Sequence, residues 1–515
     1  MDDELLLAPA HRLAAAVRGK EVSSRELLDG YLDRIGRLNP AINSVVTLDE
    51  ERAAAAAEAA DAALAAGDDV GPLHGLPITI KDAIETAGIR STGGATELTD
   101  HVPAVDAPAV ARLKAAGAIV FGKTNVPRWS GDFQTFNAIF GQTNNPWDVT
   151  RTTGGSSGGA AAAVAAGFTS FEVGTDIGGS VRIPSHCCGV FGLKPSFGVI
   201  PQRGYLDHVG GGLTDADINV FGPIARSARD LDLLLGVLAG PEPERAVAWR
   251  LDLPAANLES LSGLRVGTWL DDPACPVDTE YGALLRAAAD RLVDAGARVD
   301  DAHPPVTFGE QHALFTRMIM PAISPSLPDE AAEVMGGSHR AWLRAEEERA
   351  RLRAVWAQWF TQYDVLLLPV MTVPAFPHDN EIGLQERRIV VNGQERSLSD
   401  TIQWLGLVGV VGLPSAVVPI GKVAGLPVGM QIVAPFLHDR RAVRGRNSID
   451  EVLGAYAPPP LELREPSMTC RPQDPGRRDH PHDGSGRRLH RRAARGVHRA
   501  RGPARARCGR STHRH

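Results

Sequence analysis

The sequence predicts an α/β fold in which helices cover a β-sheet. Segments typical of strands alternate with segments typical of helices along most of the chain, which is the pattern of α/β proteins. The 515 residues, of which 43% are hydrophobic, suffice for a deep core. No linker-like stretch divides residues 1–440, so we expect a single large domain.

Helix and strand signals follow one another in order from the N-terminus. Ser23 and Glu26 form a capping box, which opens a helical pattern that runs to about Leu38. An alanine-rich helix is expected at 50–66, followed by a strand that ends at Lys81. The further elements expected are helices at 107–117 and at 279–297, the second with Asp278 as its N-cap, a strand followed by a turn within 118–125, and strands at 264–270, 364–370, 415–420 and 428–434.

The charge balance argues against a protein whose main partner is nucleic acid. Lys and Arg number 54 and Asp and Glu number 61, for a net charge of -7. The chain has no run of about 18 uncharged apolar residues that could span a bilayer. Its N-terminus, MDDELLLAPAH, has acidic residues where a signal peptide needs basic ones. These features predict a soluble, cytoplasmic protein.

The cysteines predict neither disulfides nor a metal site. They are odd in number and irregularly spaced: Cys187, Cys188, Cys275, Cys470 and Cys508. No CxxC pair supports structural zinc. We therefore expect neither a disulfide framework nor a structural zinc site.

The most informative segment is 154–182, GGSSGGAAAAVAAGFTSFEVGTDIGGSVR. Ser156 and Ser180 each lie in a glycine-rich turn, and a small-residue helix and a strand separate them. A serine in a sharp turn can serve as a nucleophile, and backbone N–H groups freed by glycines can form an oxyanion hole. The nucleophile needs a base. His186 lies nearby, and Lys81 ends an apolar strand, where burial would lower its pKa.

Less specific interpretations compete with this one. GGSSGG alone is more often a linker or a turn, and a lysine at a strand end is more often solvated. A phosphate-binding loop fits poorly because GxxxxGK[ST] is absent. His186 is more often structural than a base. These residues alone leave the choice between a linker and a serine hydrolase open.

Taken together, the motifs of this chain resemble one known family, the amidase signature enzymes. The blocks that carry the resemblance follow one another in order and include the segment above: GLPITIKD (75–82), FGQTNNPWD (140–148), GGSSGG, GTDIGGSVRIPS, GVFGLKP, VFGPIARSARDL (220–231) and GLPVGMQIVAP (425–435). The resemblance covers about residues 20–460. It implies an amidase domain at 1–460 with a mixed, twisted sheet covered by helices on both faces.

The resemblance also implies a Ser–cis-Ser–Lys triad, for which we expect no metal and no cofactor. Ser180 would be the nucleophile, Ser156 the proton relay after a cis peptide bond, and Lys81 the general base. The implied oxyanion hole consists of the backbone N–H groups of Ile177, Gly178, Gly179 and Ser180. Supporting roles fall to Asp176, Arg182 and Ser157, and Ser130 would line the acyl pocket. His186 then stays structural.

The family contains several kinds of enzyme. Residues 124–137 carry Trp129, Phe133 and Phe136 where the glutaminase subunit of the tRNA amidotransferase has a Gly- and Ser-rich stretch, which favours a free-standing amidase that hydrolyses a small-molecule amide. The glutaminase subunit remains an alternative. We expect neither a specific nucleic acid nor a membrane as partner, and a homodimer is open.

The C-terminus departs from the family. The closing helical pattern is interrupted at 444–448, and residues 467–515 contain 14 Arg and no Lys, Ile, Phe, Tyr or Trp. This tail could be a nucleic-acid-binding arm, a histidine-rich metal binder, or a GC-rich message translated out of frame, which we favour. In each case we expect disorder. A damaged, inactive member acting as a binding protein is therefore a further alternative.

Overall fold

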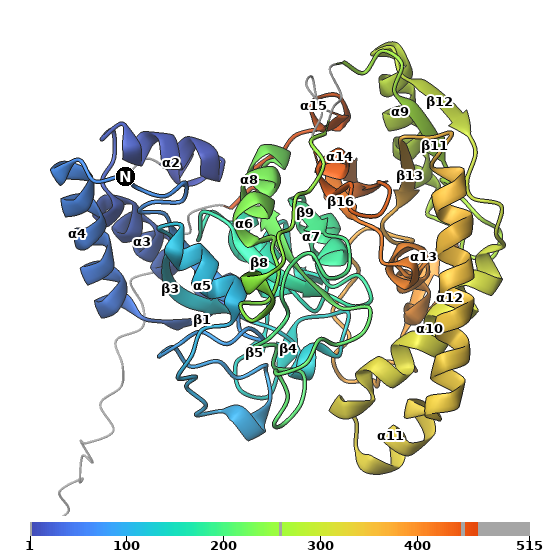
Figure 1. The fold of residues 1–515 in the computed structure, drawn as a ribbon, viewed down its shortest axis with the longest axis horizontal. Coiled ribbons are helices and arrows are strands. Elements are labelled where there is room, and N and C mark those ends of the chain that lie inside the picture. Colours follow the sequence, from blue (N-terminus) through green and yellow to red (C-terminus); the bar gives the residue numbers. More distant parts are fainter. Residues whose placement is uncertain (1–2, 257–259, 444–448, 462–515) are drawn as a thin grey trace, which may run out of the picture. The chain divides into compact units, whose positions relative to one another are not determined.

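The computed structural model describes residues 3–256, 260–443 and 449–461. Residues 1–463 form one compact unit, whose described elements are shown in Figure 1. The interruption expected at 444–448 and the tail expected at 467–515 lie outside the described residues.

A mixed eight-stranded sheet forms the centre of this unit, with the order β12-β11-β13-β17-β16-β9-β10-β8. The strands β11, β12 and β13 run parallel to one another, and every other neighbouring pair is antiparallel. The bounds are β8 (Glu172–Asp176), β9 (Phe191–Lys194), β10 (Val220–Ala225), β11 (Arg265–Thr268), β12 (Arg298–Asp301), β13 (Val365–Pro369), β16 (Ser415–Val423) and β17 (Leu426–Val433). The predicted α/β fold with a mixed sheet is confirmed.

Helices pack against strands β12, β17, β16, β9, β10 and β8 of this sheet. They are α6 (Gly158–Ala165), α7 (Arg182–Cys188), α8 (Ala228–Leu238), α9 (Thr279–Asp294), α14 (Asp439–Val443) and α15 (Ile449–Leu453). A separate helical group contains α10 (Phe308–Ile323), α11 (Asp329–Gly336), α12 (His339–Trp359) and α13 (Gln403–Val411). In Figure 1 the long helix α12 runs beside α10 and α13, which it contacts.

A second, three-stranded sheet of order β1-β3-β2 carries Lys81. Its strands are β1 (Val45–Leu48), β2 (Pro77–Lys81) and β3 (Ile119–Thr124), and the helices of the N-terminal region are α1 (Asp3–Leu6), α2 (Ala10–Arg18), α3 (Ser24–Ile42), α4 (Glu50–Ala66) and α5 (Pro108–Ala115). Strand β2 packs against β8 of the main sheet. The strand alternation of the sequence did not reveal this division into two sheets.

The remaining strands form two-stranded ribbons. They are β4 (Phe136–Asn137) with β5 (Gly141–Gln142), β6 (Asn144–Asn145) with β7 (Asp148–Thr152), and β14 (Arg388–Val391) with β15 (Gln394–Ser397). The first two ribbons lead the chain to Ser156.

Local sequence signals are confirmed where they rest on short-range chemistry. The Ser23 hydroxyl accepts the Glu26 N–H, and the Glu26 carboxylate accepts the Ser23 N–H at 2.9 Å. The Asp278 side chain caps α9 as expected. This helix ends at Asp294, before the expected 297, because Gly296 adopts a left-handed φ of 94° that terminates it.

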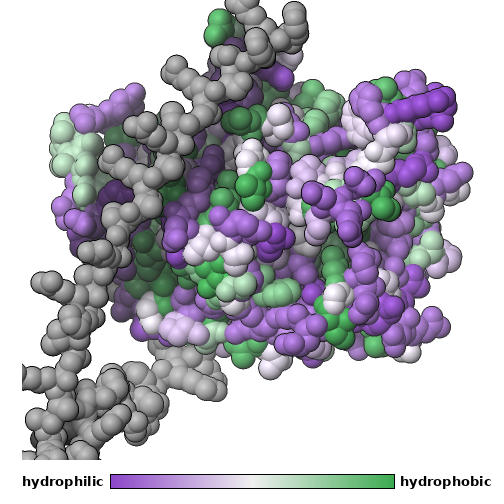
Figure 2. All heavy atoms as spheres, turned by 90° about the horizontal axis from the view of Figure 1, so that it is seen from below, coloured by the Kyte–Doolittle hydropathy of each residue, from purple (hydrophilic) through white to green (hydrophobic). Residues whose placement is uncertain are grey.

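The surface seen in Figure 2 carries hydrophobic side chains in small groups among polar ones. Within the described residues, no helix is both long and apolar enough to cross a membrane. The three cysteines in this part of the chain, Cys187, Cys188 and Cys275, are buried and free.

Candidate active site

The two glycine-rich turns of the sequence lie in direct contact. Ser156 precedes α6, and Ser180 lies between β8 and α7. The backbone N–H of Ser157 donates to the carbonyl oxygen of Ser180 at 3.1 Å. A Cβ on Gly159 would lie only 2.4 Å from the backbone nitrogen of Asn125. The small residues of this segment therefore permit close packing, and the linker interpretation is wrong.

The peptide bond between Gly155 and Ser156 is cis, as the resemblance implies. The backbone of the preceding loop lies directly against it. A Cβ on Gly155 would lie 2.5 Å from the carbonyl oxygen of Asp132 and 2.7 Å from the carbonyl carbon of Phe133. Only a glycine fits between this loop and the cis bond.

Lys81, at the end of β2, is fully buried and reaches the first turn. Its Nζ lies 2.7 Å from Ser156 Oγ and 2.7 Å from Thr175 Oγ1. Burial lowers the pKa of Lys81 to about 7, although the negative charges of Asp176 and Glu172 act in the opposite direction. A large fraction of this amine is therefore neutral near pH 7.

Ser180 is the member of this group that retains exposed surface. It is 7% exposed, whereas Lys81, Ser156 and Ser157 are 0% exposed. Among the described residues, Lys81 is the hydrogen-bond partner of Ser156 Oγ, and no hydrogen bond joins Ser156 Oγ to Ser180. A molecule arriving from outside would thus meet Ser180 first.

Asp176 and Arg182 organise the turn that carries Ser180. Oδ1 of Asp176 accepts the backbone N–H of Gly179 at 2.9 Å, and Oδ2 accepts that of Val181 at 3.1 Å. The Arg182 guanidinium donates to both carboxylate oxygens. Burial acts to raise the pKa of Asp176, but the Arg182 charge and its hydrogen bonds hold that pKa below its usual value. The carboxylate therefore stays ionised as an acceptor for the turn.

This arrangement changes the expected set of oxyanion donors. The Gly179 N–H is occupied by Asp176, so it does not point freely into the site. The N–H groups of Ile177, Gly178 and Ser180 have no acceptor among the described residues. Three of the four expected donors are thus available.

Ser157 and Ser130 differ in their hydrogen bonding. The hydroxyl of Ser157 donates to the Thr175 carbonyl and accepts its N–H, both at 3.3 Å, which ties the first turn to β8. Ser130 Oγ is buried and has no hydrogen-bond partner among the described residues.

The loop around Ser130 has an unusual backbone. Trp129 and Ser130, in the 3-10 helix η2 (Arg128–Ser130), have φ values of 53° and 57°. Non-glycine residues seldom adopt this left-handed region, and such residues are enriched at functional sites. Trp129 is buried, whereas Phe133 and Phe136 are half-buried.

A comparison of the sequence with models of known protein families also bears on this site. The sequence model of the amidase family matches residues 26–324 and 315–443. The chain belongs to the amidase family. It is an enzyme of the class that hydrolyses amide bonds.

Two curated relatives cover most of this amidase. It is 34% identical over 470 residues to a glutamyl-tRNA(Gln) amidotransferase subunit of a Roseiflexus species, with 84% of this chain and 93% of the relative covered. It is 33% identical over 468 residues to indoleacetamide hydrolase of Bradyrhizobium diazoefficiens, with 86% of each chain covered. The fold resembles a bacterial aryl acylamidase of the amidase signature family, with a TM-score of 0.75, 27% identity, and 86% and 96% coverage of the two chains.

Three features of the amidase site were missed by sequence reasoning. Thr175 is the second partner of Lys81. Glu172 is buried beneath them, accepts the Thr124 hydroxyl at 2.8 Å, and has its pKa raised by burial to about 7. Gln431 accepts an Arg182 N–H at 2.9 Å from a strand far away in sequence. A lone glutamate in an apolar strand is the only one of these signals visible in the sequence.

The buried histidine near Ser180 is bound to the backbone. His186 Nδ1 accepts the Gly429 N–H at 3.0 Å, and its Nε2 lies 3.1 Å from the Val373 carbonyl. Burial lowers the pKa of His186 to about 4. Neither ring nitrogen is available to a serine. The described residues of the amidase also contain no group of three or more His, Cys, Asp or Glu arranged to hold a metal ion.

Proposed function

We propose that this amidase hydrolyses a carboxylic acid amide to the carboxylate and ammonia or an amine, through an acyl-enzyme on Ser180. The observation that best supports this proposal is the 2.7 Å contact between Ser156 Oγ and the buried Nζ of Lys81. Because burial lowers the pKa of Lys81 to about 7, neutral Lys81 can accept a proton at physiological pH. The Ser156 hydroxyl can accept a proton from Ser180 and donate its own proton to Lys81.

Acylation then proceeds in one proton relay. Ser180 Oγ attacks the amide carbonyl carbon, its proton moves to Ser156, and the Ser156 proton moves to Lys81. The Ser156–Ser180 hydrogen bond that this needs is expected to form when substrate turns the Ser180 hydroxyl inward, because catalytic hydrogen bonds often tighten only in the substrate complex.

The tetrahedral intermediate carries a negative charge on the former carbonyl oxygen. The N–H groups of Ile177, Gly178 and Ser180 are its proposed donors, and each such donor contributes on the order of 3–4 kcal/mol. As the C–N bond breaks, the relay returns the proton to the leaving nitrogen. Water then attacks the acyl-enzyme, gives its proton to the same relay, and releases the carboxylate and Ser180.

We further propose that the acyl group is partly apolar. Trp129, Phe133 and Phe136 lie on the loop that approaches Ser156 through Gly155, and Ser130 adds a hydroxyl to this region. The similarity to an indoleacetamide hydrolase and an aryl acylamidase supports an aromatic or hydrophobic acyl or amine portion. The triad chemistry requires no metal or cofactor.

The second candidate is a glutaminase-type subunit of a tRNA amidotransferase. It is favoured by the similarity to the Roseiflexus amidotransferase subunit. The aromatic loop at 129–136 favours the free-standing amidase instead. A purified chain that hydrolyses aryl amides without a partner supports our proposal, whereas activity confined to glutamine in the presence of partner subunits supports the alternative.

The deciding experiment combines an amide panel with a serine-reactive fluorophosphonate. We expect hydrolysis of at least one aliphatic or aryl amide, and a single labelled residue, Ser180, in the peptide map. Labelling elsewhere, or no hydrolysis across the panel, would contradict the proposal and favour an inactive binding protein. Cytoplasmic fractionation and light scattering test the proposed location and whether the chain is a monomer or a homodimer.

A further inference from the structure

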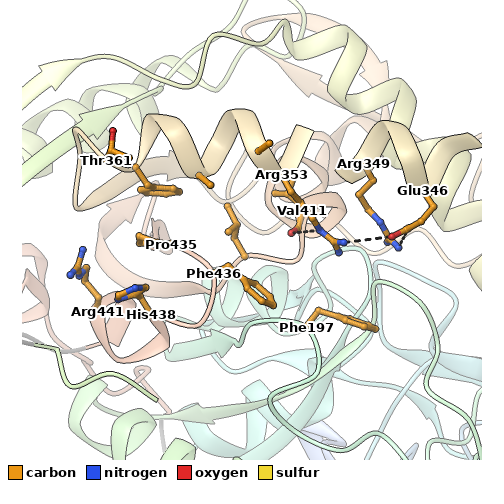
Figure 3. Close-up of a pocket in the computed structure, with 14 residues that line it drawn as sticks. Phe197, Glu346, Arg349, Arg353, Thr361, Val411, Pro435, Phe436, His438 and Arg441 are labelled. Atoms are coloured by element: carbon orange, nitrogen blue, oxygen red, sulfur yellow. Dashed lines mark hydrogen bonds and ion pairs between the residues drawn. The ribbon is translucent and has the colours of Figure 1, made fainter. Parts of the chain in front are cut away.

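A cavity of about 750 Å³ lies apart from the residues assigned above. Figure 3 shows it between α12, the C-terminal end of α13, and the segment that joins β17 to α14. None of the residues proposed to act in amide hydrolysis lines it.

The middle of this cavity is apolar. Its hydrophobic lining includes Phe197, Phe360, Val411, Leu413, Pro435 and Phe436. Phe436 is 48% exposed, and its ring lies along the cavity in Figure 3. On α12, Ala354 and Ala357 present only methyl groups to this space. The cavity therefore suits a hydrocarbon or aromatic body.

The charged groups around the cavity have a net positive charge. The guanidinium groups of Arg349, Arg353, Arg441 and the neighbouring Arg265 pair with the carboxylates of Glu346, Asp217 and Asp364. Four cations thus share three anions within this described cluster. One negative charge would complete the balance.

The imbalance is located at one end of the cavity. Arg349 pairs with both Asp217 and Glu346, so the end that it shares with Arg353 is well neutralised. Arg441 instead lies 3.4 Å from Asp364, a carboxylate that also accepts two hydrogen bonds from Arg265.

Arg441 also has an unused donor. Its Nε is buried and has no hydrogen-bond partner among the described residues, which is also true of Arg349 Nε at the other end, so the charge balance and not this donor distinguishes the Arg441 end. Figure 3 shows Arg441 beside His438 at the end opposite Arg349. An anion at this end would balance the second positive charge of the two, Arg441 and Arg265, that share Asp364.

We propose that this cavity binds a monoanionic carboxylate with an apolar body, such as an arylalkyl carboxylate. Its carboxylate accepts hydrogen bonds from Arg441 and lies near His438. Its body lies between Phe436 and the apolar wall formed by Phe360 and Leu413. This site is separate from the Ser180 site and does not depend on the proposed function.

Calorimetric titration of the full chain with 4-phenylbutyrate tests the proposal, with 4-phenylbutanol as the neutral analogue. We expect the alcohol to bind about tenfold more weakly, because it lacks the charge-assisted contact. Arg441→Gln should weaken carboxylate binding about tenfold and leave the alcohol unchanged. Equal affinity for the two ligands in the wild-type protein would overturn the proposed anion recognition.

Because Arg441→Gln also removes the Arg441–Asp364 ion pair, a second variant tests the site without changing any charge. Ala354→Trp keeps every ion pair but fills the cavity, so it should abolish binding of both ligands. Arg351→Gln is the matched control, because Arg351 lies on the same helix, is 72% exposed and does not line the cavity. Wild-type affinity in the tryptophan variant would overturn the site.

Crystals soaked in 4-bromophenylbutyrate locate the ligand independently. We expect an anomalous bromine peak between Phe436 and Leu413, and the carboxylate against Arg441. A peak confined to the Ser180 region would overturn the proposal and assign the measured binding to the amidase site.

Discussion

Two buried lysines of this amidase have the same depressed pKa and different surroundings. Burial lowers the pKa of both Lys81 and Lys194 to about 7, and both are 0% exposed. Lys81 Nζ contacts the hydroxyls of Ser156 and Thr175. Lys194 Nζ donates to the backbone carbonyls of Pro195 and Leu413, each at 2.9 Å.

This difference shows that a lowered pKa alone does not identify a general base. A hydroxyl can accept a proton from one neighbour and donate its own to another, whereas a carbonyl oxygen has no proton to give. Lys194 therefore joins two chain segments, the end of β9 and the segment after α13. Lys81 contacts Ser156, the hydroxyl that we propose passes the Ser180 proton on to Lys81.

A third buried lysine shows that contact with a hydroxyl alone does not make a lysine a general base either. Burial lowers the pKa of Lys123 to about 8, and its Nζ contacts the hydroxyls of Thr86 and Ser91. Both hydroxyls donate to backbone carbonyls within their own loop, so their protons are already engaged. Among the described residues, Ser156 has no such acceptor.

Replacing Ser180 tests the comparison most severely. We expect Ser180→Ala to lower kcat/KM by at least about 10⁴-fold, because no other group would form the acyl-enzyme. The small, 7% exposed side chain predicts an unchanged melting temperature. Steady-state hydrolysis and thermal unfolding measure the two effects, and full turnover by the purified variant would remove Ser180 as nucleophile.

The paired variants Lys81→Met and Lys194→Met test whether the partners decide the role. Lys81→Met should lower kcat by about 10³-fold or more through loss of the base. Lys194→Met should keep turnover within about threefold but lower the free energy of unfolding by about 1–3 kcal/mol, since it leaves buried carbonyls unpaired. Equal losses of kcat in the two variants would show that the hydrogen-bond partners do not decide which lysine acts as the base.

Ser156→Ala tests the relay itself. We expect kcat to fall by about 10²–10³-fold, the range of a lost proton-transfer group, while the circular dichroism spectrum stays that of the wild type. Ser157→Ala provides the matched neighbour, with a smaller loss expected because, among the described residues, its hydroxyl bonds to the Thr175 backbone and not to Lys81. A loss of less than about tenfold for Ser156→Ala would argue against the relay.

The pH dependence of kcat/KM is the test with the smallest expected effect. Because Lys81 must be neutral to act as a base, kcat/KM should rise with pH, by about tenfold per unit below pH 7, and level off above about 7. Lys194→Met should leave the midpoint in place, since Lys194 is not in the relay. A profile that is flat from pH 5 to 9 would show that no group with this pKa limits the reaction.

Much of the fold follows from local sequence signals. The alanine-rich helix at 50–66 and the strand that ends at Lys81 have the bounds expected for them. The capping interactions of Ser23 and Asp278 are also present. These features depend on neighbours within a few residues, so periodicity and caps suffice to predict them.

Other features depend on contacts that periodicity does not encode. Strand β10 lies between β8 and β9, although it follows both in the sequence. The long helices α10 and α12, and the cavity beside α12, carried no motif that sequence reasoning recognised. Pairing order and packing of distant segments decide such features.

The sequence by itself determined which residues could do chemistry: two serines in glycine-rich turns, a lysine at the end of an apolar strand, and the motifs that resemble the amidase signature. Only the tertiary structure decided how they meet. It placed Lys81 Nζ 2.7 Å from Ser156 Oγ and gave the Gly179 N–H to Asp176. The physical reason is that burial and hydrogen-bond partners, which come from segments far apart in the chain, set both the charge of Lys81 and the donors left free around Ser180.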